Sequence, residues 1–120
     1  MLILLDPAHG HNTPGKRSPD GTLLEYAYTR DLANQILATL QSKGKTIRTD
    51  YARDGDPDGE ENFYILRHTH CPAVLIENFF MDNKKDLAYL LSQEGRRDIL
   101  ETIIDGIEMC VLTLVYLSFK

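Results

Sequence analysis

The 120-residue chain has few of the features that mark disulfide-rich domains or nucleic-acid-binding proteins. Its two cysteines, Cys71 and Cys110, are too few for a disulfide framework. It has no block of basic residues and no stripe of basic residues alternating with aromatics, and its formal net charge is −5. This balance argues against nucleic acid as a partner. We therefore expect a domain that is held together by its apolar core.

Long apolar runs are also missing. Residues 2–5 are apolar, but Asp6 ends this run and no basic residues precede it, so we expect no signal peptide. Residues 110–119 are apolar but too few to span a bilayer, and acidic residues such as Glu108 precede them. The sequence therefore predicts no membrane span and leaves the compartment open. A hydrophobic share of 42% and a length of 120 residues are typical of one globular domain.

The first half of the chain alternates between a strand pattern and a helix pattern. Residues 2–5 predict a buried strand, and a long loop rich in Pro and Gly follows over residues 6–24. Residues 25–43 predict a helix that ends at Gly44, followed by a short extended piece and an acidic loop up to residue 62. The helix has an apolar stripe made of Leu32, Ala33, Ile36, Leu37 and Leu40.

The second half repeats this alternation. Residues 63–66 are apolar and fit either a helix or a strand, and residues 73–76 predict a buried strand. Asp82 or Asn83 is expected to cap one helix, and Ser92 to cap the next. Strands that alternate with helices predict an α/β fold: a single-domain α/β sandwich with a mostly parallel, reduced sheet flanked by helices.

Chemically active side chains follow the predicted strands. His9 lies just after the first strand, Glu77 directly follows the predicted strand 73–76, and Glu25 opens the first helix. Ligands of open α/β sheets bind beyond the carboxyl ends of the strands, so these three side chains are expected to converge. Zinc takes nitrogen and carboxylate ligands, and a nearby unbound carboxylate can move a proton. This pattern indicates a hydrolytic zinc site.

The segments "ILLDPAHG" and "CPAVLIENFFMDNKKDLAYLL", with Glu25 between them, resemble the zinc-dependent N-acetylmuramoyl-L-alanine amidases of the amidase-3 type. The resemblance implies a hydrolase that cleaves the amide between muramic acid and L-alanine in peptidoglycan. It implies that His9 and Glu25 are zinc ligands and that Glu77 is the catalytic carboxylate. A protein of this kind acts on the cell wall, whether it is secreted, periplasmic or released by a phage.

The chain departs from that family at one point. The family has a third zinc ligand, a histidine in a strand that reads like "SIHAN", and no such stretch follows the first helix here. The resemblance therefore implies a shortened amidase-3 domain over residues 1–120, with an internal deletion. His11, His68, His70, a partner chain or water are the candidates for the third ligand. Exposed sheet edges predict pairing with a second copy, as a homodimer.

Two alternatives stay open. The chain can be a catalytically inactive amidase relative that binds peptidoglycan, or a truncated remnant that lacks the third ligand. Glu77 can be a structural partner of Arg30 or Arg67 rather than a catalytic group. Under the enzyme interpretation, Asp6 orients the loop or His9, and Arg17 and the acidic loop are candidates to contact the glycopeptide.

Overall fold

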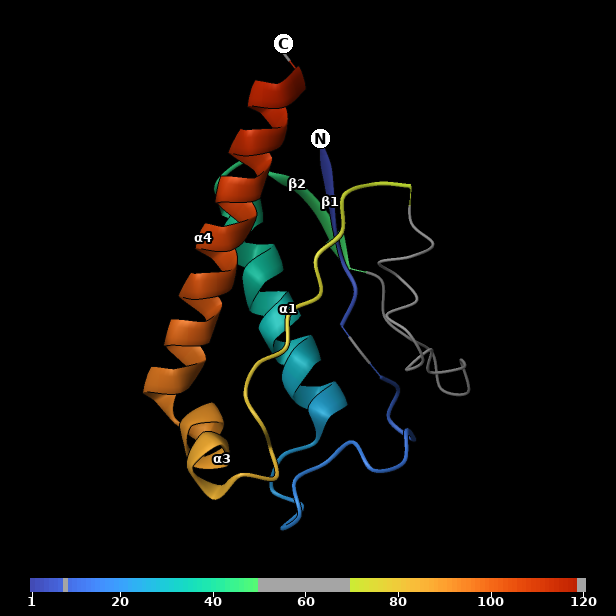
Figure 1. Cartoon of the computed structure of the whole chain (residues 1–120), viewed down its shortest axis with the longest axis vertical. Helices are drawn as coiled ribbons and strands as arrows, with labels where there is room; N and C mark the ends of the chain where they lie inside the picture. The colour runs from blue at the N-terminus through green and yellow to red at the C-terminus, as the bar shows by residue number, and fades with distance from the viewer. Residues whose placement is uncertain (8, 50–69, 119–120) are drawn as a thin grey trace.

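The computed structural model describes residues 1–7, 9–49 and 70–118 (Figure 1). Its elements are, in chain order, β1 (Leu2–Leu5), α1 (Glu25–Ser42), β2 (Thr46–Thr49), α3 (Lys84–Leu91) and α4 (Gln93–Ser118). The predicted acidic loop beyond residue 49, the apolar residues 63–66 and His68 lie outside the described residues.

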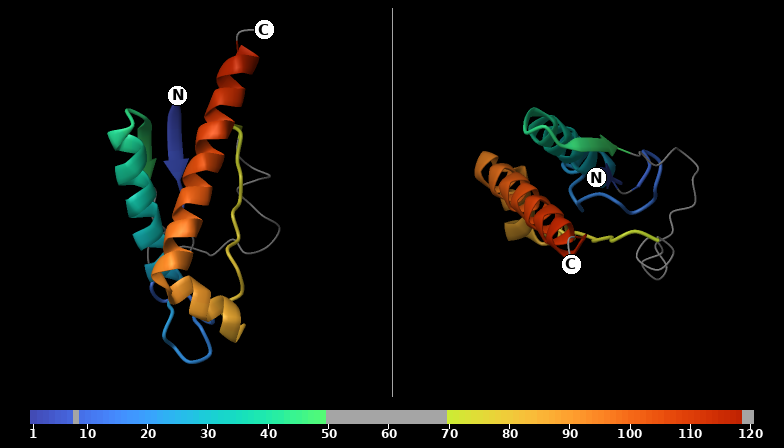
Figure 2. Two further views of the ribbon diagram at one scale, coloured as in Figure 1. Left: turned by 90° about the vertical axis from the view of Figure 1, so that its left-hand side faces the viewer. Right: turned by 90° about the horizontal axis from the view of Figure 1, so that it is seen from above.

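Strands β1 and β2 form a parallel pair connected through helix α1. Ile3 lies opposite Ile47, and Leu5 lies opposite Thr49. Parallel neighbours need a crossover connection, which α1 supplies by packing against β2. This βαβ unit, with helices α3 and α4 added to it, confirms the α/β class (Figures 1 and 2).

The sheet is buried on one face only, so the prediction of a fully buried first strand is wrong. Ile47 is buried, and Ile3 and Leu5 pack partly against the same core. Leu2 and Leu4 point to the other face, where Leu4 keeps 59% of its surface exposed. Successive strand residues face opposite sides, and in the described part of the chain the helices cover one of these sides.

Helix α1 confirms the predicted stripe and its predicted end. Leu32, Ile36 and Leu40 are buried, and Leu40 has no exposed surface. Beyond the helix, the Gly44 N–H donates to Gln41 O at 2.9 Å and the Lys45 N–H donates to Leu40 O at 2.9 Å. These two bonds form a Schellman motif, and Gly44 adopts the positive φ of 75° that this motif requires.

Helices α3 and α4 also begin at predicted caps. The Asn83 side chain accepts hydrogen bonds from the Lys85 and Asp86 N–H groups. Ser92 separates the two helices, and its Oγ accepts the Gly95 N–H at 2.9 Å. Helix α4 packs on both α1 and α3, and its carboxyl end extends past the rest of the fold (Figure 1). Among the described residues, no helix combines the length and the apolar character of a membrane span.

The predicted strand over residues 73–76 is absent, so this prediction is wrong. The segment is irregular, its side chains are exposed, and it runs on the α4 side of the molecule (Figures 1 and 2). Within the described residues the sheet has two strands, and neither pairs with this segment. A strand needs a neighbour to bond its backbone groups, so apolar composition alone does not create one.

Candidate functional site

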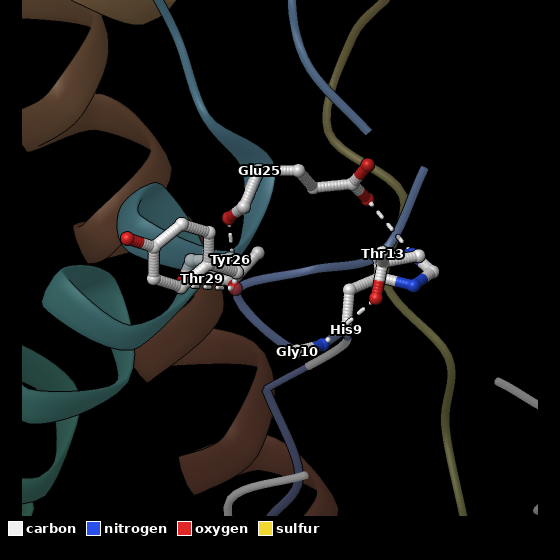
Figure 3. A network of polar contacts seen from close by, with 6 residues as sticks. All are labelled: His9, Gly10, Thr13, Glu25, Tyr26 and Thr29. Carbon is white, nitrogen blue, oxygen red and sulfur yellow. Dashed lines mark hydrogen bonds and ion pairs between the residues drawn. The ribbon is translucent and has the colours of Figure 1, made fainter. Parts of the chain in front are cut away.

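The structure brings His9 and Glu25 together. His9 Nε2 lies 3.4 Å from Glu25 Oε1, and the two side chains keep 12% and 26% of their surface exposed. Figure 3 shows the Glu25 carboxylate pointing at the imidazole ring. His9 comes from the loop after β1 and Glu25 from the first turn of α1, so the pair forms where the βαβ unit turns from strand to helix.

The loop between these residues returns to the helix start through backbone bonds. The Glu25 N–H donates to Lys16 O at 3.1 Å, and Arg17 forms an antiparallel bridge with Leu24. These contacts hold the first residue of α1 against the loop. The segment before Glu25 therefore positions this residue through backbone hydrogen bonds. The sequence pattern predicted the same segment only as a long loop.

A compact turn within residues 18–23 supports this connection. Ser18 is buried, its N–H donates to Leu23 O at 2.9 Å, and its Oγ accepts the Leu23 N–H at 3.0 Å. The Asp20 carboxylate accepts the Ser18 hydroxyl at 2.6 Å and both the N–H and hydroxyl of Thr22. These bonds, that from Ser18 first, hold the pKa of Asp20 below its usual value.

Sequence reasoning missed this turn as part of the site. The stretch "SPDGT" contained the pattern that could have found it, because Pro, Asp and Gly favour tight turns and Asp bonds backbone groups two residues on.

The backbone at His9 is in an unusual conformation. His9 has a φ of 65°, in the left-handed region that non-glycine residues adopt rarely. The next residue is fixed by a bond from the Gly10 N–H to Thr13 Oγ1 at 3.1 Å (Figure 3). Such conformations are retained where the surrounding structure requires them, and they concentrate at functional sites.

The spacing of the pair fits two ligands of one metal ion. Zinc–nitrogen and zinc–oxygen bonds of about 2.0–2.2 Å at a tetrahedral angle place the two ligand atoms about 3.4 Å apart. The observed distance from His9 Nε2 to Glu25 Oε1 is 3.4 Å, longer than the 2.7–2.9 Å of a direct charged hydrogen bond. The donor types and their separation therefore suit zinc.

A third protein ligand does not join this pair. Over residues 1–7, 9–49 and 70–118, no group of three or more His, Cys, Asp or Glu side chains could hold a metal ion. His11 instead packs edge-on against the Tyr26 ring, with 5.2 Å between ring centroids, and His70 is exposed. Neither candidate completes a three-ligand site with His9 and Glu25.

Glu77 does not follow a buried strand in this structure. It is exposed on the irregular segment, so the expectation of a buried strand before it is wrong. The end of this segment is tied to α3 by a bond from the Phe80 N–H to Asp86 Oδ2 at 3.0 Å. The Phe79 ring also packs edge-on against Tyr89, with 5.2 Å between ring centroids.

The fold is of the α/β class, and it places an imidazole and a carboxylate side by side at the start of α1. Comparison with known proteins then points to a particular family. Residues 57–109 match the family model Amidase_3, described as N-acetylmuramoyl-L-alanine amidase. This match includes Glu77 but not His9 or Glu25.

Two curated relatives extend the similarity over most of the chain. The N-acetylmuramoyl-L-alanine amidase AmiC of Neisseria meningitidis serogroup B is 30% identical over 113 residues, which are 92% of this chain and 26% of AmiC. The probable cell wall amidase LytH of Staphylococcus aureus is 29% identical over 102 residues, which are 82% of this chain and 33% of LytH.

The chain therefore spans about a quarter to a third of the length of the curated relatives it matches. No solved structure matches it. The family match and the named relatives support a relationship to the N-acetylmuramoyl-L-alanine amidases.

Proposed function

We propose that the chain is a peptidoglycan hydrolase that cleaves the amide between N-acetylmuramic acid and L-alanine. The observation that carries this proposal is the pair of His9 and Glu25, held at the spacing of two zinc ligands. The similarity to the amidases supplies the substrate. The domain proposed to do this is the whole of residues 1–120, a shortened amidase-3 domain.

His9 and Glu25 would hold Zn²⁺, which when bound lowers the pKa of water and polarises the amide carbonyl. Glu77 would act as the catalytic carboxylate, accepting a proton from the attacking water and delivering it to the leaving amine nitrogen. Asp6, which directly follows β1, would orient the loop that carries His9. Glu77 is exposed on an irregular segment, so this role requires its carboxylate to reach the bound water from that segment.

We also propose that the chain has lost a strand and the third ligand by internal deletion. The sheet of two strands in the described residues supports this proposal, and so does the absence of a third donor there. A second copy of the chain could supply the missing ligand, since β1 and β2 each leave one edge without a strand partner in the described part of the chain.

The test is zinc binding together with hydrolysis. We expect the purified chain, without a His tag, to bind close to one equivalent of zinc and to release dye from labelled peptidoglycan. His9→Ala should weaken zinc binding more than tenfold and abolish release, because one of two protein donors is lost. His70→Ala is the matched control, since this histidine is exposed and outside the pair.

Glu77→Gln separates zinc binding from catalysis. It should retain zinc and lose most of the dye release, because an amide cannot accept the proton. Release that is unchanged in Glu77→Gln would contradict its catalytic role.

The alternative is a relative that binds peptidoglycan without cleaving it. It is favoured by the absence of a third ligand among the described residues and by the exposure of Glu77. Less than about a tenth of an equivalent of zinc, with co-sedimentation on cell walls and no dye release when zinc is added, would establish this alternative and exclude the enzyme.

A further inference from the structure

A cavity of about 180 Å³ lies beside the His9–Glu25 pair. It is formed by loop residues 10–17 together with Leu24 and Tyr26 at the start of α1. His9 immediately precedes this loop, and Glu25 lies between the two helix-side residues. A group bound in the cavity would therefore be next to the proposed reaction centre.

The lining of the cavity is cationic in an acidic protein. Lys16 and Arg17 contribute two positive charges, His11 adds an imidazole, and none of the lining residues is Asp or Glu. The whole chain has a formal net charge of −5, so a lining with two basic residues and no acidic residue differs from the average of the molecule. Such a lining favours an anion, and a guanidinium suits a carboxylate in particular.

An aromatic ring lies at the helix side of the cavity. The His11 ring packs edge-on against Tyr26 at 5.2 Å, and the Arg30 guanidinium lies 5.5 Å from the centre of the Tyr26 ring. Together with Leu24, this ring gives the cavity an apolar surface next to its cationic one. A ligand that joins a short apolar stem to a carboxylate would match both surfaces.

The cavity is also formed in advance. Its loop is closed by the Glu25 N–H bond to Lys16 O, by the bridge of Arg17 with Leu24, and by the bonds of the buried Ser18. A binding surface that is already ordered loses less entropy when its ligand binds.

We infer that this cavity binds a carboxylate on the peptide arm of the glycopeptide, an inference that rests on the proposed function. The sugar arm has no free carboxylate near the scissile bond, because the lactyl carboxyl group is consumed in the amide itself. The peptide arm keeps a carboxylate beyond its L-alanine, on an α-carbon that also carries a short apolar chain. Arg17 is thus a specificity-determining residue that selects stem peptides with a free carboxylate.

The experiment compares two ligands that differ in one group and whose γ-carboxyl is blocked in both: N-acetylmuramoyl-L-alanyl-D-glutamate γ-methylamide with its α-carboxylate free, and the same compound with an α-carboxamide. Binding is measured by NMR titration of the full chain in EDTA, so that no metal contributes. We expect the free carboxylate to bind about fivefold more tightly, the size of one ion pair with an exposed side chain. Arg17→Gln should bring the two affinities together.

Arg97→Gln is the matched control. It removes the same charge from an exposed side chain on α4 that lies 3.6 Å from Asp98, and the fivefold preference should persist. Equal affinities in the wild-type chain, or a preference that survives in the double variant Lys16→Gln/Arg17→Gln, would overturn the inference. Binding of glycerol phosphate that depends on Arg17, without any difference between the two glycopeptides, would overturn it in favour of a wall phosphate.

The inference and the proposed function fail in different ways. Dye release with zinc, combined with equal affinities for the two glycopeptides, would retain the hydrolase and remove the carboxylate site. A carboxylate preference that depends on Arg17, in a chain that never releases dye, would retain the site and remove the hydrolase.

Discussion

At the scale of single residues, Tyr28 has a buried hydroxyl group that accepts and donates no hydrogen bond within the described part of the chain. The Arg96 guanidinium lies 5.0 Å from the centre of its ring. Burial raises the pKa of Tyr28, while Arg96 acts to lower it and Asp31 to raise it. The folded protein therefore favours the neutral phenol.

This leads to a prediction for Tyr28→Phe. Removing a buried hydroxyl that lacks a partner should leave the free energy of unfolding unchanged or raise it by up to about 1 kcal/mol at pH 7. In the wild-type chain, the folded state favours the neutral form of Tyr28. This contribution to the free energy of unfolding is fully present below the pKa of Tyr28 in the unfolded chain, near 10, and is lost as the pH rises through its higher pKa in the folded protein. Urea unfolding at pH 7 and pH 10.5 measures both effects.

Tyr89→Phe is the contrasting variant. The Tyr89 hydroxyl donates to Asp98 Oδ2 at 2.8 Å, so its removal should lower stability at pH 7. A loss of stability in Tyr28→Phe as large as that in Tyr89→Phe would show that the Tyr28 hydroxyl has a partner after all.

Sequence patterns anticipated His9 and Glu25 as neighbours, although these residues are 16 positions apart in the chain. The anticipation worked because a strand, a loop and a helix in a βαβ unit bring the end of the strand close to the start of the helix. For Glu77 the same reasoning depended on a third strand, and the described residues contain only two strands. Whether a strand forms depends on a neighbour elsewhere in the chain, and residues 73–76 do not reveal that neighbour.

At the scale of elements, the helices were predictable because their boundaries depend on local residues. Asn83 and Ser92 cap helices through their own side chains, and Gly44 ends α1 through its own backbone. The periodic apolar positions of α1 then identify the face that packs. The two strands were also located correctly, but their one-sided burial depends on which helices cover the sheet.

The end of α1 gives a prediction that distinguishes two kinds of glycine. Gly44→Ala should lower the free energy of unfolding by about 1 kcal/mol, because a side chain at a φ of 75° is strained even though no atom lies within 4 Å of its Cβ. Gly106→Ala, within α4 and equally uncrowded, should raise it by about 0.5–1 kcal/mol. Thermal or urea unfolding measured by circular dichroism tests both variants. If both variants were destabilised, lack of space for the added methyl group, rather than backbone conformation, would explain the effect at these two positions.

At the scale of the whole molecule, apolar surface remains exposed in several places, and two of them bear on association. One is the open face of the sheet, with Leu2 and Leu4. The other is the irregular segment, where Val74 keeps 73% of its surface exposed and Phe80 is similarly open. Exposed apolar surface next to strand edges favours association. The exposed sheet face supports the proposal that the chain has lost a strand.

We therefore predict that the chain associates as its concentration rises and that Leu4→Glu weakens this association. Leu4 lies opposite Arg48 on the exposed face, so a glutamate there gains a cross-strand cation while adding charge to the surface. Light scattering after size exclusion should show the wild-type molar mass rising with concentration and the variant staying nearer 13.7 kDa.

Leu5→Glu, on the partly buried face, should instead destabilise the fold. Identical masses for the wild type and Leu4→Glu at every concentration would show that the open face of the sheet takes no part in association. If a second copy supplies the third zinc ligand through this face, Leu4→Glu should lose zinc affinity along with the larger species.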